Sequence, residues 1–334
     1  MKIVIFGTGA VGGHVAARLG AGAARAGIEV SVVARGAQLA AIRERGLTLW
    51  IGDERTDARV HVTDRPETLG AQDVVFVALK SSTLPDAVPA MAPLIGPDTS
   101  VVFAMNGIPW WYLYRCPDNG LPRPDLSRLD PGGVLARTVG LECVIGCMIN
   151  SANMVVEPGV IRNSTGTQNR FTLGEPDGVR SRRIEAISAA FERAGVRAPV
   201  STAIRNEIWE KLLRNLSTSP ICAITGEPIG VISRHPELFE LAKGLMTEGL
   251  ATAKAHGVDP GITVEHAYAR APTTTHKSSM LQDFEANRPP EIDGLLTSVQ
   301  QFARVAGVPT PQVDAVTALV IEKARGAGLY PAPL

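Results

Sequence analysis

The sequence predicts an α/β fold, with a doubly wound, mostly parallel sheet in the N-terminal part and an all-helical C-terminal part. Three observations predict it. Short apolar runs alternate with helical patterns through the first half, the first run leads into glycines, and the pattern is almost entirely helical after about Thr202. A chain of 334 residues exceeds what one core usually organises. We therefore expect two domains, residues 1–200 and 201–334.

The expected strands are the near-continuous apolar runs that parallel sheets covered on both faces require. They cover residues 2–7, 30–35, 73–80, 100–106, 141–149, 159–164 and 170–175. The expected helices cover residues 11–26, 37–45, 179–194, 203–217, 236–256, 278–306 and 311–325. Residues 114–133 contain four prolines and three glycines without a clear period, which predicts a surface loop in the first domain.

The composition argues against nucleic-acid and membrane partners. Lysine plus arginine and aspartate plus glutamate number 33 each, so there is no basic field to hold an anionic surface. No apolar run approaches the roughly 18 residues of a membrane span. The thiols of Cys116, Cys143, Cys147 and Cys222 have no histidine at zinc-site spacing. They are typical of reduced core residues in a cytoplasmic protein, and no metal site is expected.

A glycine-rich turn follows the first expected strand, where residues 3–13 read IVIFGTGAVGG. Gly7 permits a tight turn, Gly9 lets the backbone approach a pyrophosphate, and Gly12 lets the following helix pack closely on the strand. The helix N-terminus then offers free N–H groups and a positive dipole end to phosphates. Because the triplet opens a βαβ unit, the sequence predicts a Rossmann-type dinucleotide-binding domain.

The end of the second strand indicates which dinucleotide is bound. NAD-binding domains usually place a carboxylate there, whereas this chain reads SVVARG and has Arg35. A guanidinium can pair with a 2′-phosphate and stack on adenine, which favours NADP(H). The alternative is a solvated arginine at a strand end.

Two further strand ends carry polar residues, Lys80 after the third strand and Asn106 after the fourth. Ligands of doubly wound sheets bind outside the carboxyl ends of the strands, so both are candidate site residues. Alternatively, Lys80 is a surface lysine, and Asn106-Gly107 is a common turn pair.

In the second half, Glu207, Lys211 and Asn215 recur every four residues and share one helix face. Spacing alone leaves two readings open, a solvated Glu–Lys pair or a lysine that faces a cleft. Glu291 follows two prolines and would open a new helix. It is either a site residue or an ordinary acid stabilised by the helix dipole.

Together these motifs resemble the ketopantoate reductase (2-dehydropantoate 2-reductase) family over nearly the whole chain. The resemblance rests on the GTGAVG opening, Arg35, the pairs Leu79-Lys80 and Asn106-Gly107, the helix EIWEKLLRN, the motif SSMLQD and the EID that begins at Glu291.

The resemblance implies NADPH-dependent reduction of 2-dehydropantoate to (R)-pantoate, a step toward pantothenate and coenzyme A. The implied cofactor-binding residues are Gly7, Thr8, Gly9, Ala10, Val11, Gly12, Arg35, Lys80, Asn106, Ala152 and Glu291. Lys211 would be the catalytic general acid, and Glu291 would orient the network around it. The implied substrate-binding residues are Asn106, Lys211, Asn215, Ser219 and Ser279.

Two departures from the family pattern leave the substrate open. Ser219 stands where better-known members carry a second asparagine, and Ile229 falls near the place of a further one. The chain also inserts a proline-rich loop after Asn106 that contains Trp110 and Trp111, which either cover the site or pack on a core edge.

The alternatives are a reductase of another branched or bulkier 2-oxo acid and a catalytically silent NADP(H)-binding protein. A 6-phosphogluconate or 3-hydroxyacid dehydrogenase is less favoured, because its glycine-rich catalytic signature is absent from the sequence. A homodimer through an apolar face of the helical domain is compatible with the pattern, as is packing within one chain.

Overall fold

The computed structural model describes residues 1–268 and 275–331 and confirms the predicted fold class. The chain forms two compact units. One contains Met1–Met105 and Gly132–Ile204, and the other contains Asn106–Pro131 and Arg205–Leu334. Residues 106–131 therefore group with the helices, whereas the sequence placed them in the first domain.

The first unit is built on a seven-stranded sheet with the order β11-β8-β7-β6-β1-β2-β5. Its strands are β1 (Lys2–Phe6), β2 (Glu29–Val33), β5 (His61–Thr63), β6 (Val74–Val77), β7 (Ser100–Ala104), β8 (Val144–Asn150) and β11 (Arg170–Gly174). All neighbours are parallel except β8 and β11. The carboxyl ends of β1, β2, β6, β7 and β8 therefore lie along one edge, as the sequence analysis expected.

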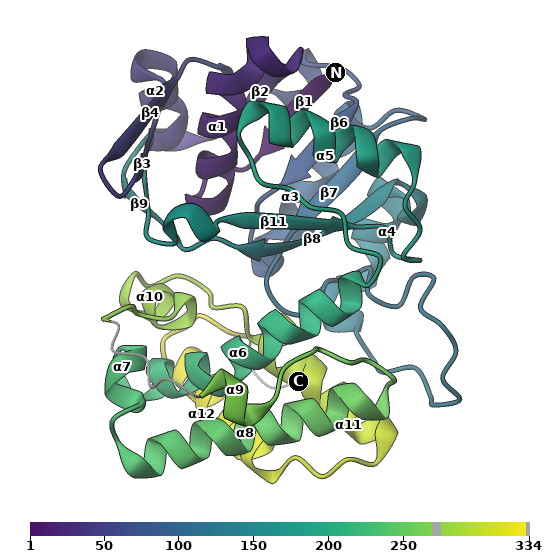
Figure 1. Ribbon diagram of the computed structural model, residues 1–334, viewed down its shortest axis with the longest axis vertical. Coiled ribbons are helices and arrows are strands. Elements are labelled where there is room, and N and C mark those ends of the chain that lie inside the picture. The colour runs from purple at the N-terminus through teal and green to yellow at the C-terminus, as the bar shows by residue number, and fades with distance from the viewer. Residues whose placement is uncertain (269–274, 332–334) are drawn as a thin grey trace. The chain divides into compact units, whose positions relative to one another are not determined.

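Helices α1 (Ala10–Ala26) and α5 (Arg182–Ala194) pack against each other beside this sheet (Figure 1). The other helices of the unit are α2 (Gly36–Arg45), α3 (Leu84–Ala87) and α4 (Val134–Val139). Short 3₁₀ turns cover Pro66–Thr68, Ser81–Thr83, Val88–Leu94, Ser127–Leu129, Pro131–Gly133, Leu141–Cys143 and Gly166–Gln168 in the two units. Strands β6 and β7 are buried along their whole length, which agrees with their uninterrupted apolar sequences.

The first unit also has a second sheet, of which the sequence predicted only the strand over residues 159–164. It has the order β4-β3-β10-β9, with β3 (Leu47–Ile51), β4 (Glu54–Ala58), β9 (Asn153–Glu157) and β10 (Val160–Asn163). Its inner side packs on α1, where Leu49 and Ile161 are completely buried. A Cβ added at Gly13 would lie 2.6 Å from Cδ1 of Ile161. Glycine at this position therefore lets the sheet approach the helix closely.

The second unit is helical. Its elements are α6 (Ile204–Thr225), α7 (Ile229–Ile232), α8 (Pro236–Ala255), α9 (Val264–Ala267), α10 (Ser279–Glu285), the π-helical turn η8 (Asp293–Thr297), α11 (Ser298–Ala306) and α12 (Pro311–Gly326). The helical stretch expected over residues 278–306 is interrupted before Glu291, where a new helix was expected to open. Helix α10 ends before Asn287, whose φ is +50°, and two prolines follow. Proline lacks the N–H that a continuing helix would need.

Aromatic packing explains why residues 106–131 belong with the helices. The indole Nε1 of buried Trp209 donates to the Tyr112 hydroxyl over 2.8 Å. The Phe302 ring lies edge-on to Tyr112 with centroids 5.3 Å apart, and Arg205 donates to the Tyr112 carbonyl over 2.8 Å. These contacts bury the start of the inserted loop in the helical core.

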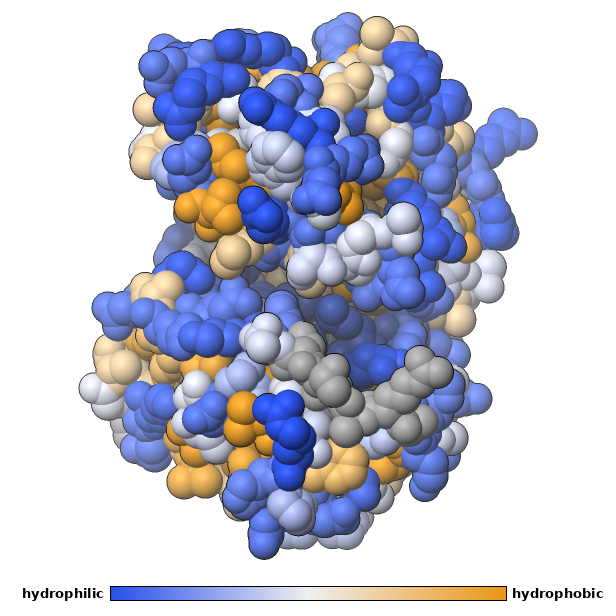
Figure 2. Space-filling view, turned by 60° about the vertical axis from the view of Figure 1, so that its left-hand side comes forward, coloured by the Kyte–Doolittle hydropathy of each residue, from blue (hydrophilic) through white to orange (hydrophobic). Residues whose placement is uncertain are grey.

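The surface in Figure 2 is mostly hydrophilic, with hydrophobic residues in separate patches. Among the helices that the structure describes, none combines the length and hydrophobicity needed to cross a bilayer.

Candidate functional site

The glycine-rich turn has the close approaches that its sequence predicts. Gly7 has a φ of +98°, and a Cβ at Gly12 would lie 1.9 Å from the Gly7 carbonyl oxygen. Gly12 therefore serves the packing of α1 on the turn. A Cβ at Gly9, in contrast, would meet no heavy atom of the described residues within 4 Å. The space above Gly9 is open to a ligand.

The N-terminus of α1 is suited to a phosphate. Its N-cap is Gly9, and in this described segment neither a capping side chain nor an acidic residue in the first turn occupies the free N–H groups. The helix has 17 residues, so the positive end of its dipole adds to these donors. The turn and helix therefore fit the pyrophosphate of a dinucleotide.

A cleft of about 420 Å³ adjoins this turn. Its lining residues are Phe6, Gly7, Thr8, Gly9, Val33, Ala34, Arg35, Gln38, Leu79, Thr83, Asp86 and Ala87. The side chain of Arg35 is exposed beyond the end of β2, and among the described lining residues Asp86 is the only carboxylate. Arg35 therefore places a basic side chain in the cleft beside the glycine-rich turn. Lys80 follows β6 but is not among these residues.

In the helical unit, the structure brings together Asn106 and Glu291, which the sequence analysis had selected independently. Asn106 Nδ2 donates to Glu291 Oε2 over 3.3 Å, and the Glu291 side chain is buried. Next to them, the Ile108 N–H donates to the Gly294 carbonyl over 2.8 Å. A Cβ at Gly107 would lie 2.3 Å from that carbonyl oxygen, and its φ is +74°. Gly107 therefore allows the loop to pack on the start of η8.

Helix α6 presents Lys211, Asn215 and Ser219 at intervals of four residues. The Lys211 side chain is partly buried, and burial lowers its pKa from the ordinary lysine value. The charge of Arg214 lowers this pKa further, and Glu210 opposes the shift. A lysine whose charged form is disfavoured gives up its proton more readily than a solvated one.

Two residues near this face were missed from the sequence. The pKa of His276 is lowered, first by burial and then by the charge of Lys211. Ser278 is buried, donates from Oγ to the Ser219 carbonyl over 3.4 Å, and caps α10 by accepting from the Leu281 N–H. Neither has a spacing signal that connects it to α6.

The predicted substrate-binding residues differ in exposure. Ser219 is buried on α6, Asn215 is partly buried, and Ser279 is exposed at the start of α10. Of the two serines in the motif SSMLQD, Ser278 is therefore buried and Ser279 is exposed. Trp110 and Trp111 are both buried, which agrees with the core reading of these aromatics.

Ala152 lies in the turn that follows β8, and a buried polar network fixes its backbone. The Thr165 hydroxyl contacts the Ala152 N–H at 2.5 Å, and Asn163 Nδ2 donates to the Ala152 carbonyl over 3.1 Å. The network includes His14 of α1, which the sequence analysis did not select.

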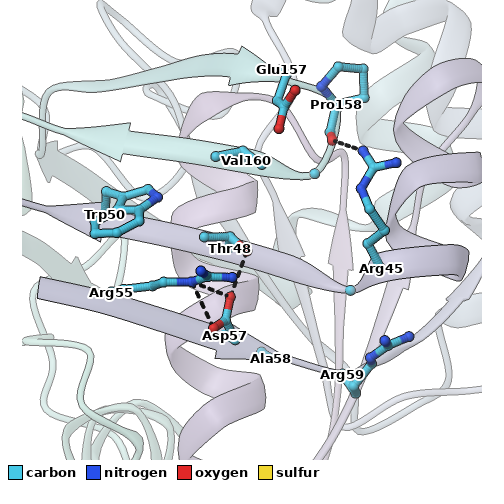
Figure 3. Close-up of a pocket in the computed structure, with 12 residues that line it drawn as sticks. Arg45, Thr48, Trp50, Arg55, Asp57, Ala58, Arg59, Glu157, Pro158 and Val160 are labelled. Atoms are coloured by element: carbon cyan, nitrogen blue, oxygen red, sulfur yellow. Dashed lines mark hydrogen bonds and ion pairs between the residues drawn. The ribbon is translucent and has the colours of Figure 1, made fainter.

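A larger hollow of about 540 Å³ lies on the four-stranded sheet and contains none of the predicted site residues. Figure 3 shows that two of its arginines contact neighbouring protein groups. Arg55 pairs with Asp57 at 2.9 Å, and Arg45 donates to the Pro158 carbonyl over 3.2 Å. This hollow is therefore not the candidate site. Within the described parts of the chain, no cluster of three or more His, Cys, Asp or Glu side chains could hold a metal ion.

Two family models match the chain. The model described as ketopantoate reductase PanE/ApbA matches residues 3–109, and the model of its C-terminal part matches residues 203–324. A 2-dehydropantoate 2-reductase of Mesorhizobium japonicum is 43% identical over 99% of this chain and 100% of its own length.

Solved structures of the same family and fold are also similar to this chain. A Ralstonia solanacearum protein assigned to the ketopantoate reductases is 38% identical, with a TM-score of 0.88 over 98% of this chain and 99% of its own. D-mandelate dehydrogenase, solved with NADH and anilino(oxo)acetate, shares the fold at 20% identity, with a TM-score of 0.79 over 98% of this chain and all of its own. The chain belongs to the ketopantoate reductase family.

Proposed function

We propose that this protein reduces 2-dehydropantoate to (R)-pantoate with NADPH, a step in pantothenate synthesis. The full-length likeness to a 2-dehydropantoate 2-reductase supports the reaction. The observation that carries the mechanism is Lys211, a partly buried lysine of lowered pKa on the α6 face that also carries Asn215 and Ser219.

The N-terminal unit would hold the cofactor. The open space over Gly9 and the uncapped start of α1 suit the pyrophosphate, and Arg35 suits the 2′-phosphate that distinguishes NADPH from NADH. Thr8 belongs to the same turn, and Ala10 and Val11 begin α1. Lys80 follows β6, and Ala152 follows β8. When bound, the dihydronicotinamide supplies a hydride to the ketone carbon.

Lys211 would provide the proton. Its ammonium group would bind the ketone oxygen, stabilise the negative charge that develops there and protonate it to the alcohol. The lysine would then regain a proton from solvent. Burial serves this role because it brings the lysine pKa closer to neutrality.

The remaining residues would orient the reactants. Glu291 accepts from Asn106, so its carboxylate is fixed to bind a cofactor ribose and to orient the network around Lys211. Asn106, Asn215, Ser219 and Ser279 would bind the hydroxyl and carboxylate of the substrate. A homodimer and a cytoplasmic location are predictions from the sequence.

The test is NADPH oxidation, followed by absorbance, with 2-dehydropantoate, 2-oxoisovalerate and phenylglyoxylate, and with NADH as the cofactor control. We expect 2-dehydropantoate and NADPH to give the highest kcat/KM. A higher kcat/KM for another ketone would overturn the substrate, and a preference for NADH would overturn the cofactor.

A second candidate is reduction of a bulkier 2-oxo acid. Ser219, in place of a larger asparagine, favours this candidate. D-mandelate dehydrogenase, which shares the fold, was solved with anilino(oxo)acetate bound. High activity with phenylglyoxylate and poor activity with 2-dehydropantoate would support this candidate. NADPH binding without turnover of any ketone would indicate a silent binding protein.

A further inference from the structure

The turn between β8 and β9 lies at the ligand edge of the large sheet. β8 is parallel to β7 and ends at Asn150, so Ser151 and Ala152 extend beyond the same edge as the glycine-rich turn after β1. Loops at this edge contact ligands in doubly wound sheets. The position of the turn therefore connects it with the dinucleotide that we propose as cofactor.

The strand order gives the direction of that dinucleotide. Arg35 follows β2, on one side of β1, whereas β6, β7 and β8 lie on the other side. A dinucleotide with its pyrophosphate on α1 and its 2′-phosphate on Arg35 must extend its nicotinamide half toward β6, β7 and β8. The Ser151–Ala152 turn is thus on the nicotinamide side.

A side-chain network connects this turn with α1. Asn153 Oδ1 lies 2.8 Å from His14 Nδ1 and accepts from Asn163 Nδ2 over 2.7 Å. The amide nitrogen of Asn153 donates to the Ser151 Oγ over 2.8 Å. Because Asn153 uses its nitrogen on Ser151, its oxygen must accept from the imidazole. His14 is therefore the Nδ1–H tautomer, with the proton assigned from the hydrogen-bond pattern.

Asn163 completes the network from β10. Its side chain is buried, and its Oδ1 accepts from the N–H groups of Thr165 and Gly166 over 3.0 and 3.1 Å. Its Nδ2 donates to the Ala152 carbonyl. With the Thr165 hydroxyl on the Ala152 N–H, both backbone groups of Ala152 are bound within the protein. The turn is therefore rigid. A ligand could pack against Ala152, but the Ala152 backbone groups already have hydrogen-bond partners.

His14 connects this turn with the helix that begins at the proposed phosphate site. It is 2% exposed, lies in the second turn of α1 and contacts the Phe171 ring with centroids 5.5 Å apart. Burial lowers its pKa to about 4, so the imidazole is neutral at pH 7 and donates one proton to Asn153. Helix α1 thus connects the two features. Its first residues would bind the pyrophosphate, and His14, one residue beyond Gly13, holds the turn through Asn153.

We infer that His14, Asn153 and Asn163 are positioning residues that hold the Ser151–Ala152 turn against the nicotinamide half of the cofactor. The inference rests on the proposed NADPH site. It requires the two halves of the cofactor to depend differently on this network, since the adenosine half lies on the β2 side.

The test compares binding of NADPH with binding of 2′,5′-ADP, which has the adenosine half and the 2′-phosphate but no nicotinamide. Both dissociation constants are measured by titration calorimetry without any ketone. The main variant is Asn153→Ala, at a partly exposed position. His14→Leu removes the imidazole that donates to Asn153, and His14→Gln restores an N–H donor at this position. The control is Thr99→Val, which removes a hydroxyl that is buried at the opposite edge of the sheet and donates to the Gln72 carbonyl over 2.6 Å.

We expect Asn153→Ala and His14→Leu to weaken NADPH about tenfold, which corresponds to about 1.4 kcal/mol, with 2′,5′-ADP changed less than about twofold. His14→Gln should recover part of the NADPH affinity, and Thr99→Val should change neither ligand. Equal weakening of both ligands would show a purely structural network and overturn the inference, as would unchanged NADPH binding. A wild type that binds no NADPH would also overturn it. Failure to reduce 2-dehydropantoate would leave this comparison intact and count against the proposed substrate alone.

Discussion

Asn106 Nδ2 donates a hydrogen bond to Glu291 Oε2 over 3.3 Å, across 185 positions of the sequence. Glu291 is buried, and the loop that carries Asn106 is held by the bond from Ile108 to Gly294. A buried carboxylate that accepts from an amide has a defined direction. The pair therefore gives the proposed site a rigid element within the helical unit.

We expect Asn106→Ala and Glu291→Ala each to lower kcat/KM by about tenfold or more, and the double variant to lose much less than the product of the two losses. The reason is that each change removes one partner of the same hydrogen bond. The measurement is a double-mutant cycle on NADPH-dependent turnover. Glu285→Ala is the control, because Glu285 is exposed and pairs with Lys277. Additive losses would show that Asn106 and Glu291 act separately.

Alanine substitutions at Gly9 and Gly12 should have different effects, one on ligand binding and the other on stability. Gly12→Ala would place a methyl 1.9 Å from the Gly7 carbonyl oxygen, so we expect it to lower the free energy of unfolding by about 1–3 kcal/mol or more. Gly9→Ala meets open space and should fold normally but weaken NADPH at least about tenfold, a loss of about 1.4 kcal/mol. Thermal unfolding and NADPH titration check both. Normal NADPH binding by Gly9→Ala would contradict the phosphate assignment.

Arg35→Asp should weaken NADPH far more than NADH, because the new carboxylate repels a 2′-phosphate and can accept from a ribose hydroxyl. The measurement is the ratio of kcat/KM for the two cofactors. Arg43→Asp, a change of the same charge on an exposed arginine of α2, is the control. A ratio that falls equally in both variants would point to general charge repulsion and refute the role of Arg35.

Lys211→Ala should lower kcat by about a hundredfold or more, as expected for loss of a positioned proton donor, while NADPH still binds. Since the donor must be protonated, wild-type activity should fall as pH rises through the lysine pKa. Burial lowers this pKa, so the fall should begin below the ordinary value near 10.4. Lys243→Ala on α8 is the control. Near-normal turnover of Lys211→Ala would refute the assignment.

His14 should make stability depend on pH. Its pKa is lowered by burial to about 4 in the folded protein, from 6.5, so protons bind the unfolded chain more strongly. The folded state should therefore lose up to about 3 kcal/mol as pH falls from 6.5 to about 4. Denaturant unfolding across this range should show the loss in the wild type and a smaller one in His14→Leu. Parallel curves would exclude His14 as the cause.

The sheet could be predicted where its strands are fully buried and uninterrupted. β6 and β7 have this pattern, whereas β4 reads ERTDA and is mostly exposed. In the second sheet, only the strand over residues 159–164 was predicted, and it forms β10. This sheet has few buried side chains, such as Leu49 and Ile161, because one face alone packs on α1. A polar strand such as β4 has little apolar signal, so only the path of the chain reveals that it joins the sheet.

The inserted loop shows a different limit. Its prolines and glycines predicted irregular backbone, and the structure has short 3₁₀ turns there. Its assignment to the helical unit depends on Tyr112, which contacts Trp209 and Phe302 far along the chain. Nothing in the local sequence specifies partners at that distance.

The sequence by itself determined the glycine-rich turn, the arginine at the end of β2 and the shared face of Lys211, Asn215 and Ser219, because each depends on spacing within one element or one turn. Only the tertiary structure decided the pairing of Asn106 with Glu291 and of His14 with Asn153. Hydrogen bonds between distant residues depend on where the folded backbone brings two side chains, and residue spacing does not encode that distance.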